Sequence, residues 1–79
     1  MTIRDRAIQQ VSEAIQMDKM CWAKVKDRAV ACRAFAEDQG TDFVVVDSDG
    51  LTRHDSPSDA ARDFVKRVGT LKALRSVKR

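Results

Sequence analysis

The chain has 79 residues, with 15 Lys and Arg against 12 Asp and Glu, and it contains two cysteines. This length predicts one domain spanning residues 1–79, and two cysteines are too few for a disulfide-based scaffold. The longest aliphatic or aromatic run is FVVV, far shorter than the ~20 residues that span a bilayer, and the charged start MTIRDR is unlike a secretory signal. We therefore expect a soluble cytoplasmic protein with no membrane contact.

Residues 2–39 contain no Gly and no Pro, and their apolar residues recur at helical spacing. Gly40 is a suitable residue to end a helix. One helix over the whole segment would be ~55 Å long at 1.5 Å per residue, which is too long for a compact domain of this size. Asp18 interrupts the apolar stripe and could cap a new helix. We therefore predict two helices, about 3–17 and 19–39, with one long bent helix as the alternative.

The pattern changes after residue 40. The segment DFVVVD is rich in β-branched residues and LTRH follows the pair Asp49-Gly50, so the two segments predict a β-hairpin. Next, Ser56 can cap a helix whose first residue is Pro57, and Gly69 can end that helix. The segment TLKALRSVKR predicts a short basic terminal helix or a fraying extension. The expected fold class is α+β, in the order α-α-β-β-α.

The stretch VVVDSDGLT, residues 44–52, resembles the opening motif of the haloacid-dehalogenase-like phosphatases. That resemblance would make Asp47 the nucleophile and Asp49 the acid and base. In that family a hydroxyl, a Lys and further carboxylates for Mg²⁺ come from later strands of a parallel sheet. Only 29 residues follow Gly50, too few for several βα units of ~30 residues each. We therefore expect a structural turn, and we predict no catalytic residue and no enzyme activity.

The chain offers few groups for a metal or redox site. Cys21 and Cys32 are eleven residues apart, which on one helix gives ~16 Å of axial separation and excludes an internal disulfide. We expect both cysteines to be buried and reduced. A structural zinc site needs about four ligands, and the two cysteines with His54 are too few. We therefore predict no metal and no cofactor.

Charge is distributed unevenly along the chain. Residues 37–63 hold eight acidic against two basic residues, whereas residues 64–79 hold six basic and no acidic residues. The basic segment can attract a polyanion, or the two segments can neutralise each other within a monomer or dimer. The candidate contacts for a polyanion or another partner are Lys66, Arg67, Lys72, Arg75, Lys78 and Arg79. Because no aromatic platform or recognisable nucleic-acid-binding motif accompanies them, we expect weak or no direct nucleic-acid binding.

A lone two-stranded hairpin is marginally stable, and the first strand of this one contains FVVV, which is apolar on both faces. Helices can cover one of these faces, so the other face or the open edge would stay exposed. A homodimer would cover it, and we therefore predict one. Met17 and Met20 beside Trp22 could form an adaptable contact surface. The candidate dimer or partner surface consists of Met17, Met20, Trp22, Phe43 and Val45.

These observations favour a small, non-enzymatic protein-binding module. Compact chains of this size without motifs are common among phage and mobile-element products, including inhibitors of bacterial defence such as anti-CRISPR proteins. Size and the absence of motifs therefore favour a regulator or inhibitor whose partner is a protein, either alone or within a nucleoprotein complex. The alternative is a nucleic-acid-binding accessory protein that uses the basic C-terminal helix.

Overall fold

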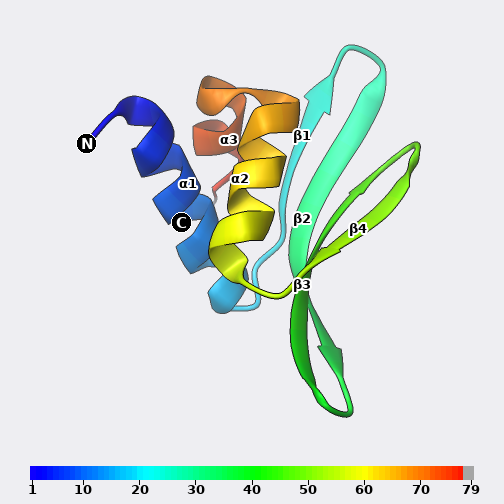
Figure 1. The fold of residues 1–79 in the computed structure, drawn as a ribbon. Coiled ribbons are helices and arrows are strands. Elements are labelled where there is room, and N and C mark those ends of the chain that lie inside the picture. Colours follow the sequence, from blue (N-terminus) through cyan, green and yellow to red (C-terminus); the bar gives the residue numbers. More distant parts are fainter. Residues whose placement is uncertain (78–79) are drawn as a thin grey trace.

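The computed structural model describes residues 1–77, which form three helices and four strands. In chain order these are α1 (Ile3–Gln16), β1 (Cys21–Val25), β2 (Arg28–Glu37), β3 (Gly40–Asp47), β4 (Gly50–His54), α2 (Pro57–Val68) and α3 (Thr70–Ser76). The strands form one antiparallel sheet in the order β1-β2-β3-β4, and the helices lie together on one side of it (Figure 1). The predicted α+β class is confirmed, but the predicted order α-α-β-β-α is right only in part.

The first helix follows the periodicity predicted for residues 3–17. The Thr2 hydroxyl accepts a hydrogen bond from the Asp5 backbone N–H at 3.1 Å, and the Asp5 carboxylate accepts one from the Thr2 N–H at 3.4 Å. This reciprocal cap satisfies backbone donors that a helix start leaves free. The chain leaves the helix at Met17 and turns at Asp18, whose φ is 61°. The buried apolar stripe consists of Ala7, Ile8, Val11, Ala14 and Ile15.

The second predicted helix, residues 19–39, is wrong, because this segment forms strands β1 and β2. Cys21 lies opposite Cys32 and Val25 lies opposite Arg28, so residues 26 and 27 form a two-residue turn. The segment contains an apolar alternation as well as a helical periodicity, and the alternation places Cys21, Val30 and Cys32 on a buried face. Pairing with β3 and burial of this face outweigh the helix propensity of the alanines in the segment.

The predicted hairpin is present, with its turn one residue earlier than expected. Asp47 pairs with Gly50, so Ser48 and Asp49 form the loop and Gly50 is the first residue of β4. The Asp47 carboxylate accepts a hydrogen bond from the Asp49 N–H at 2.8 Å, a closure that is typical of Asp in turns. Because β2 pairs with the other edge of β3, the hairpin belongs to a four-stranded sheet and does not stand alone.

Helix α2 has the predicted limits. The Ser56 hydroxyl accepts a hydrogen bond from the Asp59 N–H at 3.1 Å, and Pro57 is the first helical residue. Gly69 ends α2 and leads directly into α3, with a φ of 93° that residues with a Cβ rarely adopt. The short terminal helix is therefore present over Thr70–Ser76, and Lys78 and Arg79 lie outside the described residues.

The core lies between the helices and one face of the sheet. Its largest fully buried side chains include Phe64 from α2, Val11 and Ile15 from α1, and Val45 from β3. Burying a side chain of this size fully contributes about 1.5–3 kcal/mol relative to leaving it exposed. Figure 1 shows that α1, α2 and α3 all lie on the same side of the sheet, so the opposite sheet face has no helix against it.

Candidate functional site

The uncovered face of the sheet is defined by strand alternation. Cys21, Cys32 and Val45 belong to the core, so the residues next to them in each strand point to the opposite side. We call this side the open face. Its side chains come from Trp22 and Lys24 of β1, Ala29, Ala31, Arg33, Phe35 and Glu37 of β2, Asp42, Val44 and Val46 of β3, and Leu51 and Arg53 of β4.

An apolar row crosses the open face from one edge strand to the other. The register pairs Trp22 with Ala31, Ala31 with Val46, and Val46 with Leu51, one residue from each strand. Trp22 is 48% exposed and Leu51 is 52% exposed, and Met20, half exposed, precedes the Trp22 end of the row. Side chains directly opposite each other in neighbouring strands are close enough to contact, so the four residues form one continuous apolar surface. A continuous exposed apolar surface of this kind is typical of a contact site.

The row beside it contains Val44, which is buried although it faces away from the helices. Val44 is 1% exposed, is absent from the core cluster, and lies opposite Arg33 on one side and Arg53 on the other. Because directly opposite Cβ atoms are ~5 Å apart, the aliphatic stems of the two arginines flank the valine and shield it. The open face therefore has a packed centre bordered by two guanidinium groups.

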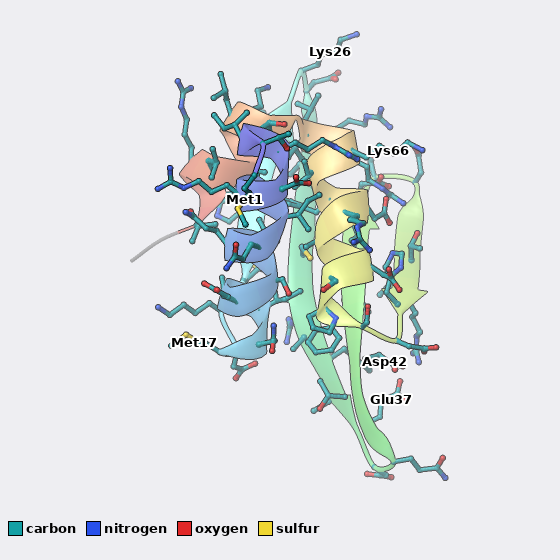
Figure 2. All side chains as sticks on the ribbon, turned by 60° about the vertical axis from the view of Figure 1, so that its left-hand side comes forward. Met1, Met17, Lys26, Glu37, Asp42 and Lys66 are labelled. Carbon is teal, nitrogen blue, oxygen red and sulfur yellow. The ribbon has the colours of Figure 1, made fainter. Side chains whose placement is uncertain are left out.

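The charges on the open face are partly neutralised at one end. Arg53 forms ion pairs with Glu37 and, at 3.6 Å, with Asp42, and its guanidinium lies 5.4 Å from the centre of the Phe35 ring. Figure 2 shows Glu37 and Asp42 at the end of the molecule opposite Lys26.

Within residues 1–77 neither Lys24 nor Arg33 forms an ion pair. Unpaired positive charge therefore borders the apolar row on both sides.

The Asp47 carboxylate is held in a network on the helix-facing side. Besides accepting the Asp49 N–H, it forms an ion pair with the Arg67 guanidinium, whose Nε donates to Asp63 at 2.7 Å. The Asp49 backbone hydrogen bond and then the Arg67 contact hold the pKa of the Asp47 carboxyl below its usual value. Both Asp47 oxygens thus have protein partners, while the Asp49 carboxylate points to an exposed ion pair with Arg28 at 2.9 Å.

Asp63 connects this network to the single histidine. Its carboxylate accepts hydrogen bonds from Arg67 and lies 2.9 Å from Nε2 of His54. Burial alone would raise the pKa of the Asp63 carboxyl, but the hydrogen bonds from Arg67 and His54 outweigh burial and lower it. Arg67 also donates to the Thr52 hydroxyl at 3.1 Å. The network connects α2 to β3 and β4. Asp47 and His54 therefore have a structural role in holding the helix against the sheet.

Four of the six basic candidate residues lie within the described residues, and they are distributed over different parts of the fold. Arg67 is engaged by two carboxylates, and Lys66, near the end of α2, lies at the same end of the molecule as Lys26 (Figure 2). Lys72 and Arg75 lie on α3 and line a hollow beside β1. Lys78 and Arg79 fall outside the described residues.

The five residues predicted to form a dimer or partner surface also lie in different parts of the fold. Val45 is 0% exposed and Phe43 packs against the core, so Val45 is inaccessible to a partner in this fold. Met20 and Trp22 belong to the exposed end of the apolar row, while Met17 is exposed at the end of α1. The sequence alone did not identify Val46 and Leu51 as members of this exposed apolar row. The alternation in β1 and β2 was a signal for the four-stranded sheet, but only the complete pairing brings these residues into one row.

Cys21 and Cys32 are buried free thiols, but not in the way that the sequence suggested. They lie directly opposite each other in β1 and β2, so the argument from their separation along a helix does not apply. Burial raises the pKa of the Cys32 thiol to about 12, and burial also raises the pKa of Cys21 although a hydrogen bond with Ser76 opposes this. Both thiols are therefore protonated at neutral pH.

Within residues 1–77 no three His, Cys, Asp or Glu side chains come together as a metal-binding group. In the same part of the chain, no helix is both long enough and apolar enough to cross a membrane. Comparisons with protein-family models, with curated proteins and with solved structures found no match to this chain.

Proposed function

We propose that this chain is a non-enzymatic protein-binding module and that the open face is its contact surface. The observation that carries the proposal is the apolar row of Trp22, Ala31, Val46 and Leu51 on the face that the helices leave uncovered. Burying the exposed half of a Trp side chain removes on the order of 100 Å² from water, which favours binding by about 2.5 kcal/mol before the costs of association. Trp22 is therefore the expected anchor of the contact.

The charges around the row define the chemistry of the partner. Lys24 and Arg33 border the row and have no carboxylate partner among residues 1–77, and Arg53 lies beyond Val44. A matching partner surface has an apolar centre with Asp or Glu side chains around it. Its carboxylates would speed association and set orientation, while the apolar centre would provide most of the affinity.

The contacts of Asp47, the first carboxylate of the phosphatase-like motif, also agree with a binding role. Asp47 accepts a turn hydrogen bond and pairs with Arg67, so a nucleophilic role would require breaking both contacts. The role of regulator or inhibitor stays a prediction from size. The homodimer also stays a prediction, and because Val44 and Val45 are buried within one chain, the apolar row is the surface on which a second copy would pack.

A pair of leucine variants tests the proposal. Leu51 on the open face is 52% exposed, and Leu71 on α3 is 60% exposed on the helix side, so Leu51→Asp and Leu71→Asp make the same chemical change on two different surfaces. Tagged wild-type protein and both variants are used to capture partners from an extract of the native host, with nuclease treatment to remove partners bridged by nucleic acid. Thermal unfolding checks that both variants remain folded.

We expect Leu51→Asp to reduce capture of an acidic partner protein by about tenfold, equivalent to about 1.4 kcal/mol, and Leu71→Asp to leave it unchanged. Capture that both variants retain equally would show that the open face is not the contact surface. If wild-type protein is self-associated by light scattering, Leu51→Asp alone is monomeric, and wild-type protein captures no acidic protein, the occupant of the open face is a second copy and the acidic-partner proposal is wrong.

A further inference from the structure

A basic hollow lies at the edge of the sheet between β1 and α3. It has a volume of about 310 Å³ and is lined by Trp22, Ala23 and Lys24 from β1 and by Lys72, Arg75 and Ser76 from α3. These two elements are 45 residues apart in sequence but pack against each other. The hollow thus combines the only tryptophan of the chain with three cationic side chains.

The positions of these groups follow from the fold. β1 is an edge strand, so the backbone groups on its outer side have no strand partner. The Lys72 ammonium donates a hydrogen bond to the Lys24 carbonyl at 2.8 Å, which fixes the Lys72 side chain against this edge. An ammonium group has three donors, so two remain for a ligand. Lys72 therefore covers part of the open edge of β1 and also holds a positive charge at a fixed place in the hollow.

In the part of the chain that the structure describes, the cations of the hollow have no carboxylate partner. Its lining contains no acidic residue, and within residues 1–77 none of Lys24, Lys72 and Arg75 forms an ion pair. Arg67, from the same basic segment of the sequence, is by contrast neutralised by two carboxylates. Three unpaired cations in one small hollow will attract an anion, and a chain of regularly spaced phosphates could contact all three.

We propose that this hollow binds single-stranded nucleic acid, with one base stacked on Trp22 and the adjoining phosphates on Lys24, Lys72 and Arg75. Trp22 is half exposed, so its ring can accept a base. Such stacking requires an unpaired base, because the bases of a duplex are stacked on one another and hidden. The site draws two of its residues from the basic segment predicted from the sequence and two from β1.

Two properties of binding follow from this arrangement. Each phosphate of a single strand that is neutralised releases counterions and adds about −0.7 to the slope of log K against log salt concentration, where K is the association constant. For three phosphates the slope should be about −2. A contact this small gives an affinity in the range of nonspecific binding, on the order of 10 μM at low salt. Because the chain has one tryptophan, quenching of its fluorescence reports directly on stacking in the hollow.

Fluorescence anisotropy with labelled oligo(dT) and oligo(U) of about eight nucleotides tests the proposal, and the two affinities show which type of strand is preferred. We expect Trp22→Ala to weaken binding about tenfold. Arg75→Glu should weaken binding and reduce the salt slope to about −1.4. Within residues 1–77 the Arg75 side chain forms no hydrogen bond whose loss could destabilise the fold. Arg62→Glu reverses an exposed charge on α2 and should change the affinity less than about twofold.

The hollow shares Trp22 and Lys24 with the open face, but a variant at the far edge of the sheet distinguishes the two proposed contacts. Leu51→Asp lies on the opposite edge strand from β1 and should leave oligonucleotide binding intact, although it removes the proposed protein contact. Binding that survives both Trp22→Ala and Arg75→Glu, tighter binding of a duplex than of the single strand, or no binding at millimolar protein would each overturn the assignment.

Discussion

Replacing Arg67 by Met tests the network that joins α2 to β3 and β4. The guanidinium contacts Asp63 through two nitrogens, at 2.7 and 3.2 Å, and also contacts Asp47 and Thr52. The Arg67 side chain is 29% exposed and that of Asp63 is 18% exposed, so the pair is neither fully buried nor freely solvated. Met keeps most of the length of the side chain and removes only the charge and the donors.

The expected loss in the free energy of unfolding lies between two limits. Removing one partner of a fully buried ion pair costs about 3–5 kcal/mol, whereas an exposed pair contributes about 0–1 kcal/mol. For a pair of intermediate burial we expect Arg67→Met to reduce the free energy of unfolding by about 2 kcal/mol. In a domain of this size that loss lowers the melting temperature by about 10 °C.

The stability difference between wild type and Arg67→Met should also depend on pH, in a direction that the pKa values determine. The pKa values of the Asp47 and Asp63 carboxyls are lowered in the folded chain. Their contribution is therefore complete above the unfolded carboxyl pKa of about 3.9 and is lost as pH falls further through the folded pKa values. The stability difference between wild type and Arg67→Met should be largest near neutral pH and should shrink at about pH 3.

Urea unfolding followed by circular dichroism, near neutral pH and at about pH 3, measures both effects. Arg62→Met is the matched control, because Arg62 lies on the same helix but its side chain is 62% exposed, and within residues 1–77 it pairs only with Asp59, at 3.4 Å. It should cost less than about 0.5 kcal/mol. If the two variants cost the same, or if the Arg67→Met difference does not shrink in acid, the network does not stabilise the fold as described.

Other parts of the structure lead to further expectations. Phe64→Ala removes a fully buried ring and should cost about 3–5 kcal/mol in urea unfolding, whereas Phe35→Ala on the open face should cost much less; equal costs would contradict the placement of the core. Because burial raises the pKa of both thiols, Cys21 and Cys32 should react with a thiol reagent no faster than the chain unfolds, and immediate reaction of native protein would show that they are accessible. Light scattering at micromolar concentration should give twice the chain mass of 8.9 kDa if the predicted homodimer forms, and a mass of 8.9 kDa at all concentrations would show that it does not.

Local signals predicted several elements correctly. The apolar periodicity of residues 3–17 corresponds to α1, and the sequence Ser56-Pro57 marks the start of α2 as its capping geometry requires. The Asp49-Gly50 pair located the β3–β4 hairpin to within one residue. Each of these features depends on interactions within a few residues, which is why the sequence alone was sufficient.

The β1–β2 hairpin could not be predicted in the same way. Ala31, Ala34 and Ala36 favour helix, and the turn contains Lys26 and Asp27 in place of a glycine, with Lys26 at a φ of 58°. The strand conformation is stabilised by non-local pairing with β3 and by burial under the helices.

The open face was missed for the same reason. Val46 and Leu51 are adjacent to Trp22 and Ala31 only after four strands have paired in register. The basic hollow likewise requires the approach of α3 to β1, so Trp22 had no predicted connection to Lys72 or Arg75.

Site-specific photocrosslinking in the native host tests the open face most directly as the protein contact. A benzophenone side chain is placed at position 51 on the open face in one protein and at position 71 on α3 in another, since both native leucines are more than half exposed. The proposal predicts that position 51 forms a crosslink to one defined acidic protein, that excess wild-type protein suppresses this crosslink, and that position 71 does not form it. A crosslink to the same protein from position 71 and not from position 51 would contradict the proposal, as would the absence of any protein crosslink from position 51.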